Sequence, residues 1–508
     1  MDQTISLSMI AQGFQTMFGP YQFLFTSFGV VVGLIVGVIP GLGGLIAMVL
    51  LIPFTINIDP TAGLGCLIGV FVAGCYGGAI TSITLGIPGS PVAAATLLDG
   101  YPMSKSGRTA EAIGLAIVSS TLGGIFSAMV LILGAPLLAS IALRFGPPEF
   151  FALGILGLAT ISSIAKESTL KGLISAAFGL LIATVGTDVF TGNLRFTFDN
   201  PELFGGIPFI STLFGIFAGS EILIQLERWE MIPTAVERLR AKLPTLKSMR
   251  RHAKTYIKSS VIGTLIGTVP GTGGVIASFI SYGEAKRSSK HPEAFGKGAE
   301  EGVIASETAN NAMVGGALVP TLALGIPGDA ASALLIGALM LHGISPGPRL
   351  FEANPELVSA IFVGFLIANF IMLGIGLLMC PLFTLVLRIK KAYLIPVIFL
   401  LCFAGIYGFR NSMFDVFLLC LFGVIGYGMR KFGFPLPPLV IAQVLGRMIE
   451  EAFRRSLLMS GGNPVIFISR PIADLIWVLV ILFVAFPYLQ RITIFKATKR
   501  PDGTTAKR

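Results

Sequence analysis

Long apolar stretches alternate with short polar segments along the whole chain. Windows such as 21–39, 112–143 and 357–387 contain almost no charged residues. Roughly 20 consecutive apolar residues are enough to cross a bilayer as a helix. The pattern therefore predicts on the order of twelve membrane segments, some of them interrupted.

The composition supports the same interpretation. Hydrophobic residues make up 54% of the 508 residues, charged residues only 12%, and the mean hydropathy is +0.85. Ordinary soluble domains are about 25% charged. We therefore predict an all-α polytopic integral membrane protein. No nucleophile motif, nucleotide-binding loop or dinucleotide fingerprint stands out, so we expect neither an enzyme nor an organic cofactor.

Glycine-rich interruptions of the apolar runs recur in the same order in the two halves of the chain. The matched pairs are GLIVGVIPGLGGLIA (33–47) with GTLIGTVPGTGGVIA (263–277), GGA (77–79) with GGA (315–317), and LGIPGS (85–90) with LGIPGD (324–329). We therefore predict two structural repeats with broken or re-entrant helices, and we expect the repeats to be inverted relative to each other, as is common in transporters.

The repeat and the charges together suggest five regions. They are an N-terminal interfacial segment (1–19), transmembrane repeat 1 (20–225), a basic connector (226–258), transmembrane repeat 2 (259–455), and a final span with a basic tail (456–508). The net charge of +10 comes largely from the connector and the tail. The positive-inside rule places both in the cytoplasm, where they would contact membrane lipids. Nucleic acid is not an expected partner, because no basic and aromatic platform is present.

The repeated interruptions predict a binding site. Broken helices are tolerated in a membrane only where they are buried in protein or line a cavity. Paired Gly/Pro breaks in two halves are typical of transporter binding sites, whereas a single break would suggest a kink or tight helix packing. The residues predicted to bind substrate are Gly41, Gly43, Gly89, Ser90, Gly271, Thr272, Gly273 and Gly328.

The second motif of each half predicts a helix start. Ser90 stands at an expected N-cap position with Pro91 as the first helical residue, and Asp329 takes the corresponding place in the second half. Helix N-termini carry free N–H groups and partial positive charge, which attract carboxylates. Asp329 could cap its helix, be protonated or bind a coupling cation, and we favour the cation role.

A polar stripe interrupts the apolar character of the second half within EEGVIASETANNAMVGGALVP (300–320). In a helix, Glu307, Asn310 and Asn311 share one face. An ionisable side chain at membrane depth is functional by default, and oxygen ligands suit Na⁺. The predicted ion-coupling residues are Ser306, Glu307, Asn310, Asn311 and Asp329. A clamp of hydrogen bonds between helices, without an ion, is the alternative.

The matching stretch of the first half, 63–79, is almost wholly apolar, so the coupling site is expected chiefly in the second half. Three other ionisable residues in apolar surroundings, Asp188, Glu221 and Asp415, lie near segment ends and are interpreted as structural or interfacial.

The combination of GVIPGLGG, LGIPGS, SETANNA and LVPTLALGIPGD resembles the large membrane subunit of the tripartite tricarboxylate transporter family. Thr308 stands where that family most often has Ser, and the hydroxyl is kept. The resemblance implies a bacterial inner membrane location, a small four-span membrane subunit and a periplasmic solute-binding protein as partners. It also implies uptake of carboxylates, from citrate to aromatic dicarboxylates, driven by a cation gradient and not by ATP.

The sequence thus predicts import of a di- or tricarboxylate coupled to Na⁺ or H⁺. The alternative is a passive carboxylate channel or facilitator without ion coupling. A channel would need a continuous polar file on several helices, and most spans here are apolar. A membrane-embedded enzyme would need a catalytic pair near an interface, and none is visible.

Overall fold

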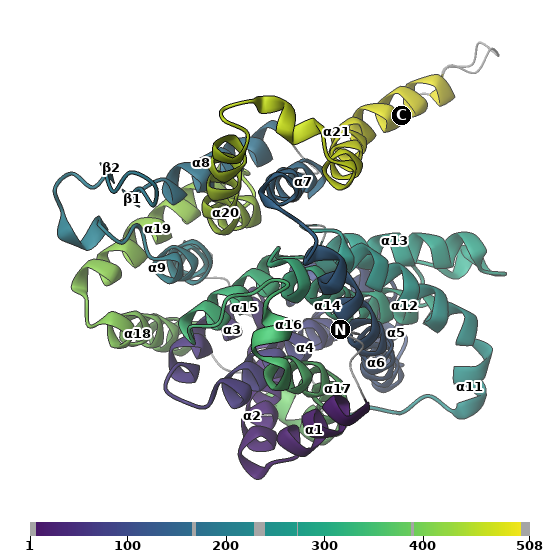
Figure 1. Ribbon diagram of the computed structural model, residues 1–508. Coiled ribbons are helices and arrows are strands. Elements are labelled where there is room, and N and C mark those ends of the chain that lie inside the picture. The colour runs from purple at the N-terminus through teal and green to yellow at the C-terminus, as the bar shows by residue number, and fades with distance from the viewer. Residues whose placement is uncertain (1–6, 165–168, 228–238, 272, 388–390, 499–508) are drawn as a thin grey trace.

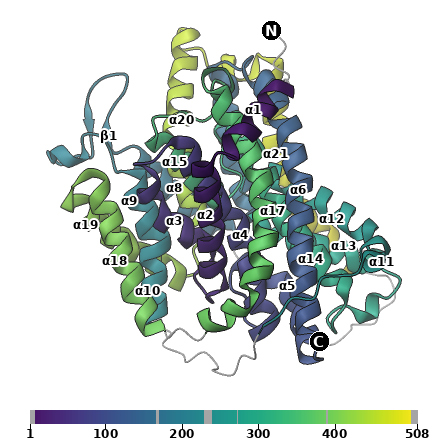
Figure 2. The same ribbon diagram turned by 90° about the horizontal axis from the view of Figure 1, so that it is seen from below.

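The structure, a computed structural model, is helical almost throughout (Figure 1). It describes residues 7–164, 169–227, 239–271, 273–387 and 391–498. The strands found among these residues are β1 (Gly186–Thr187) and β2 (Leu194–Arg195), which form a short antiparallel hairpin that projects away from the helices (Figure 2).

The first half contains long apolar helices and several shorter elements, with the β-hairpin between α8 and η2. In chain order they are α1 (Leu7–Met17), α2 (Pro20–Val38), α3 (Gly43–Thr55), α4 (Pro60–Leu85), η1 (Pro91–Ala93), α5 (Ala94–Lys105), α6 (Thr109–Ala142), α7 (Pro147–Ile164), α8 (Thr169–Ala183), η2 (Pro201–Leu203), α9 (Phe209–Leu213), the π-helical η3 (Phe214–Gly219) and α10 (Ser220–Glu227).

The second half follows a similar order. Its helices are α11 (Leu246–Arg251), α12 (Ala253–Thr268), α13 (Gly273–Ser288), η4 (Pro292–Ala294), α14 (Glu300–Leu324), α15 (Ala330–Leu341), α16 (Leu350–Ala353), α17 (Pro355–Val386), α18 (Lys391–Arg410), α19 (Met413–Lys431), α20 (Pro437–Met459), η5 (Pro464–Ile468) and α21 (Pro471–Thr498).

The helix lengths confirm a polytopic all-α membrane protein. Within the described ranges, six helices are long and apolar enough to cross a bilayer: α2, α4, α6, the continuous α9–η3–α10, α17 and α19. Six shorter apolar helices accompany them. Helix α14 is not among the six long apolar helices, although it is 25 residues long and buried over most of its length. It carries the polar stripe.

The breaks have the same backbone conformation in both halves. Glycines with positive φ occur at corresponding positions, namely Gly41, Gly43 and Gly86 in the first half and Gly271, Gly273 and Gly325 in the second. Residues with a Cβ rarely adopt this conformation, so glycine is needed where the chain reverses out of one helix and begins the next. The interruptions are therefore helix ends and not kinks.

Close glycine contacts confirm that the halves share a scaffold and correct one detail of the alignment. A Cβ atom added at Gly77 would lie 2.9 Å from Gly37 Cα, and one at Gly316 would lie 3.0 Å from Gly267 Cα. Gly77 therefore corresponds to Gly316 and not to Gly315. The predicted GGA match was wrong by one residue, because helix contact and not letter identity sets the correspondence.

Helices α4 and α14 form the centre of the molecule. Helices α2 and α3 pack on α4, and α12 and α13 pack on α14 in the same way. Two long helices pack on the central helix of the other half: α6 of the first half packs on α14, and α17 of the second half packs on α4. The halves thus interlock, and the six elements around α4 and α14 form the larger body seen in Figure 1.

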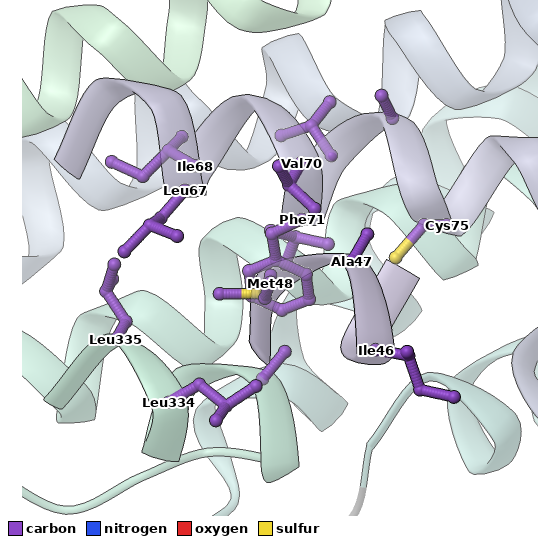
Figure 3. Close-up of a cluster of buried hydrophobic side chains, with 14 of the residues drawn as sticks. Ile46, Ala47, Met48, Leu67, Ile68, Val70, Phe71, Cys75, Leu334 and Leu335 are labelled. Atoms are coloured by element: carbon purple, nitrogen blue, oxygen red, sulfur yellow. The ribbon is translucent and has the colours of Figure 1, made fainter. Parts of the chain in front are cut away.

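The remaining helices exchange partners between the halves. Helix α20 of the second half packs against α7 and α8 of the first, while α9–η3–α10 of the first half packs against α19 of the second. Figure 1 shows these groups beside the central body. A large apolar cluster joins the central body to the α19 group; Figure 3 shows its part where Met48 of α3, Phe71 of α4 and Leu334 of α15 meet.

Two helix bounds differ from the predicted region boundaries. Helix α12 begins at Ala253, inside the predicted connector, and α20 continues to Met459, beyond the predicted end of repeat 2. The reason is that basic residues in the outer turns of both helices resemble a loop in composition. Residues 228–238 of the connector lie outside the described ranges. The cytoplasmic placement of the connector and the inverted orientation of the repeats stay predictions.

The close packing of the break against α4 predicts a stability effect. A Cβ atom added at Gly74 would lie 2.3 Å from Gly44 Cα. Because the nearest atom belongs to the backbone of α3, it cannot move aside as the end of a flexible side chain could. We expect Gly74→Ala to destabilise the protein by about 1–3 kcal/mol through overpacking. In the control Gly428→Ala, on α19, the added methyl group has no atom within 4 Å. The thermal unfolding temperature in detergent should fall for Gly74→Ala and stay unchanged for Gly428→Ala. Equal unfolding temperatures of the two variants would contradict the close contact between Gly74 and Gly44.

Candidate functional site

A cavity of about 620 Å³ lies where the broken helices of both halves meet. The wall on the side of α4 and α14 includes residues from both breaks of each half. Among them are Gly41–Ile46, Gly89–Val92, Gly273–Ile276 and Asp329–Ala331. The paired interruptions seen in the sequence thus come together in space at one cavity.

Four helices begin at this cavity. They are α3 at Gly43, the η1–α5 segment at Pro91, α13 at Gly273 and α15 at Ala330, and first-turn residues of each line the wall. The first N–H groups of a helix have no intrahelical acceptor, and the helix dipole adds partial positive charge. Four such starts around one cavity favour an anion. The sequence predicted the α5 and α15 starts as anion sites; the α3 and α13 starts add two more.

The N–H groups of the breaks themselves hold the two motifs of each half together. Gly41 N–H donates to Gly89 O at 3.2 Å, and Gly271 N–H donates to Gly328 O at 2.6 Å. Because these donors are used within the protein, Gly41 and Gly271 shape the wall and do not offer free N–H groups, while Gly328 contributes its carbonyl to this link. Gly328 also donates to Thr321 Oγ1 at 3.3 Å, behind the cavity.

The two second motifs differ in their capping. Ser90 is the N-cap and Pro91 the first helical residue, as predicted, but the Ser90 hydroxyl makes no capping hydrogen bond and has no partner among the described residues. Asp329 forms a capping box: Ser332 N–H donates to Asp329 Oδ1 at 2.8 Å, and Asp329 N–H donates to Ser332 Oγ at 2.8 Å. Asp329 thus places a carboxylate at the α15 start, whereas no side chain caps the η1–α5 start. There Pro91 has no N–H, and the N–H groups of Ala93 and Ala94 donate to Ser90 O and Pro91 O.

The facing wall of the cavity comes from other helices and is largely apolar. It consists of Phe217, Arg430, Gly433, Phe434, Pro435, Leu436, Pro437 and Ile441. Arg430 supplies the single ionisable side chain of this wall. Among the described residues, the lining thus contains one carboxylate, Asp329, and one guanidinium, Arg430.

The structure brings together most of the predicted substrate residues. Gly41, Gly43, Gly89, Ser90, Gly271 and Gly273 line the cavity together with Asp329. Gly328 lies behind the wall, and Thr272 lies outside the described residues. Ser306, Glu307, Asn310 and Asn311 do not line the cavity.

Glu307 lies in a fully buried polar cluster between the halves. Ser120 of α6 donates to Glu307 Oε2 at 2.8 Å, and Thr96 of α5 donates to Glu307 Oε1. The Ser306 hydroxyl lies 3.1 Å from that of Thr96. No cationic side chain among the described residues pairs with this carboxylate. An unpaired buried charge is costly, so a proton or a bound cation is the natural partner of Glu307.

The two asparagines of the stripe bond to the apolar helix α4. Asn310 Nδ2 donates to Cys75 O at 3.3 Å, and Asn311 Nδ2 donates to Val72 O at 3.4 Å. Both side-chain oxygens are buried without a hydrogen-bond donor among the described residues. The amide nitrogens therefore link α14 to α4 as the clamp alternative describes, while the amide oxygens have no donor among the described residues, and the ion-coupling role of both asparagines stays a prediction. Cys75 itself lines the cavity, so the stripe lies directly behind its wall.

The other ionisable residues noted in the sequence form ion pairs. Asp188 beside the β-hairpin pairs with Arg454 at 2.6 Å, and the Arg454 guanidinium holds the pKa of this carboxyl well below its usual range. Asp415 lies 3.5 Å from an Arg410 nitrogen. Glu221 pairs with Arg430, which connects it to the cavity wall.

Sequence reasoning missed Arg430 and the loop after it. The signal available was the proline-rich stretch FGFPLPP (432–438), which interrupts an otherwise apolar region directly after a cationic residue. Arg430 and its neighbour Lys431 resemble the basic residues that end many membrane helices on the cytoplasmic side. Only the tertiary contact with the broken helices distinguishes this arginine.

Comparison with known proteins gives related sequences over most of the chain. A family model described as the tripartite tricarboxylate transporter TctA family matches residues 23–441. An Agrobacterium vitis protein, described as an uncharacterized 52.8 kDa protein in the TAR-I ttuC' 3' region, is 37% identical over 467 residues, 92% of this chain and 93% of its own length. A second protein of this organism, described as lying in the TAR-II ttuC' 3' region, is 37% identical over 211 residues, 42% of this chain and 87% of its own length.

Proposed function

The chain belongs to the tripartite tricarboxylate transporter TctA family, and from this premise we propose that its cavity binds a di- or tricarboxylate, which the protein imports together with Na⁺ or H⁺. Membership of this family makes the chain the large, multi-pass membrane subunit of a transporter. The family is a transporter family and not an enzyme family. The identity of the substrate, the ion and the coupling are the parts that we propose.

One observation carries the substrate proposal: four helix starts, one of them capped by Asp329, surround a cavity in which Asp329 is the single carboxylate among the described lining residues. Backbone N–H groups hold an anion without a permanent full charge. Such a site binds a carboxylate at membrane depth and still lets it leave. The volume of about 620 Å³ lies within the range of roughly 300–1,000 Å³ that small-molecule sites occupy.

The position of Glu307 supports the coupling proposal. Thr96, which donates to it, lies on α5, which continues directly from η1, and the start of η1 at Ser90 and Pro91 lines the cavity. Asn310 on the neighbouring turn bonds to Cys75, another lining residue. A cation or proton at Glu307 would therefore act on elements that also hold the substrate. We propose Ser306, Glu307, Asn310 and Asn311 as the coupling site, with Asp329 as a second carboxylate nearer the substrate.

Family membership implies further subunits. We propose that these are a small four-span membrane protein and a periplasmic solute-binding protein that delivers the carboxylate, and that the complex lies in the bacterial inner membrane. No further cofactor is proposed.

Uptake into proteoliposomes tests the function. The full-length chain would be reconstituted with both partners, and citrate uptake would be followed with a Na⁺ gradient, a proton gradient or neither. We expect accumulation only with one of the gradients and without added ATP. Equal citrate entry without any cation gradient would support the passive facilitator instead.

The capping box gives a test of Asp329. Asparagine caps helices as well as aspartate does, so Asp329→Asn should keep the fold but remove the charge. We expect this variant to need about tenfold or more cation for half-maximal uptake if the carboxylate binds the ion, as one charged contact is worth about 1.5–3 kcal/mol. Asp329→Ala, which also loses the cap, should in addition lose about 0.5–2 kcal/mol of stability.

Cation titration of uptake, together with thermal unfolding, separates these effects. An unchanged cation dependence in Asp329→Asn would leave Asp329 with the capping role alone.

A further inference from the structure

The ion pair between Glu221 and Arg430 depends on an unusually close contact between two helices. The π-helical η3 precedes α10 and packs against α19 through small residues: a Cβ atom added at Gly219 would lie 3.0 Å from Gly423 Cα, and one at Gly426 would lie 2.9 Å from Ile216 O. π-Helical turns often occur at functional sites, where they redirect the side chains that follow. Here the contact brings Glu221 of α10 to Arg430 at the end of α19.

The pair is asymmetric in its exposure. The Glu221 side chain is almost fully buried, while that of Arg430 is one-third exposed and lines the cavity. Arg430 Nη1 donates to Glu221 Oε2, and Gln225 Nε2 donates to Glu221 Oε1 at 2.6 Å. No other guanidinium nitrogen of Arg430 has an acceptor among the described residues. Glu221 thus orients the guanidinium and leaves most of its five N–H donors for another anion.

The same cluster reaches the first break. A Cβ atom added at Gly41 would lie 2.2 Å from Gln225 Nε2 and 3.2 Å from Glu221 Oε1. The arginine and its supporting residues therefore meet the broken-helix wall at one edge of the cavity. A substrate that contacts the helix starts with one carboxylate would face, across the cavity, an apolar wall with one strong donor, Arg430.

We propose that Arg430 binds a second carboxylate of the substrate, so that the cavity selects di- and tricarboxylates over monocarboxylates. This inference rests on the proposed function, because it assigns the first carboxylate to the helix starts. Arginine is suited to the role, since its planar fork binds a carboxylate through two parallel hydrogen bonds. A monocarboxylate would use the helix starts alone and gain nothing from Arg430.

Equilibrium binding to the full-length chain in lipid nanodiscs tests the assignment, with citrate, succinate and propionate as probes. We expect Arg430→Gln to weaken citrate and succinate binding by roughly 10- to 100-fold and to change propionate binding by less than about twofold. Arg430→Lys should lie between, because an ammonium lacks the fork. The control Arg455→Gln, which removes an exposed guanidinium paired with Glu451, should behave like the wild type.

A double variant separates a loss of substrate binding from a folding defect. Arg430→Gln leaves the buried Glu221 without a cationic partner, whereas Glu221→Gln with Arg430→Gln removes both charges together. The double variant should fold and show the same selective loss of citrate and succinate. Undiminished binding of both acids, or an equal loss for all three probes, would overturn the inference and leave the pair as a clip between α10 and α19. A wild-type chain that binds none of the three acids would instead contradict the proposed function itself.

Discussion

Replacing Glu307 with glutamine is expected to reduce cation-driven uptake to the level of vesicles without protein. The carboxylate is fully buried, accepts hydrogen bonds from Thr96 and Ser120, and has no cationic partner among the described residues. Glutamine keeps the size and one oxygen acceptor but can neither carry a proton nor neutralise a cation. If Glu307 supplies the coupling charge, nearly all gradient-driven transport should be lost.

The fold should survive this change. Removing an unpaired ionisable group from a buried site does not leave a partner charge behind, so the thermal unfolding temperature should stay equal or rise. The matched control is Glu293→Gln, at an exposed position of η4. Cation-dependent uptake at the wild-type rate in Glu307→Gln would show that the polar stripe is only a clamp between helices.

The second large effect is expected from filling the cavity at a break. Gly273 begins α13 and lines the cavity. A Cβ atom added at Gly273 would have no heavy atom within 4 Å beyond its chain neighbours. A leucine at this position would project into that space and exclude the substrate. The positive φ of 66° costs about 1–2 kcal/mol for any residue with a Cβ. We therefore expect lost citrate binding with a modest loss of stability.

Two variants separate blockage from backbone strain. Gly273→Ala carries the same backbone cost without the bulk and should keep binding within about tenfold. Gly283→Leu places the same side chain on α13 at an exposed position without close neighbours, and should bind like the wild type. Gly43→Leu should also block transport, but there an added Cβ atom already lies 3.2 Å from Ser90 Cβ, so stability should fall as well. Intact citrate binding in Gly273→Leu would mean that the break lies away from the substrate.

The sequence predicted the parts of the fold that depend on local chemistry. Membrane segments follow from apolar length, and the breaks follow from glycines that must take positive φ, such as Gly41 and Gly271. The N-cap roles of Ser90 and Asp329 follow from residue type and the proline or small residue that comes next. These features are encoded within a few residues, so no tertiary information is needed.

Features that depend on contacts between distant helices could not be predicted in the same way. The exchange of α20 and α9–η3–α10 between the halves has no local signal, and without it Arg430 cannot be told from an ordinary basic residue at a helix end. The partners of Glu307 also come from the other half, because Thr96 and Ser120 are unremarkable hydroxyls in apolar segments. The sequence predicted that Glu307 matters but not where its partners lie.

The capping of Asp329 illustrates a choice that sequence left open. Three roles fitted a carboxylate after a PG turn, and the cation role was favoured. The structure places one carboxylate oxygen in the capping box with Ser332. The Ser332 N–H bonds to Oδ1, which does not by itself exclude a cation, and the cation role stays a prediction.

The central claim, that substrate carboxylates are held by the helix starts around the cavity, is tested most directly by a structure of the full-length protein with bound citrate. We predict at least one carboxylate within about 3 Å of backbone N–H groups at the starts of α3, η1–α5, α13 or α15, with the starts that have no side-chain cap, at Gly43 and Pro91, as the first candidates. Citrate carboxylates more than about 6 Å from all four helix starts, well beyond hydrogen-bond reach, would contradict it.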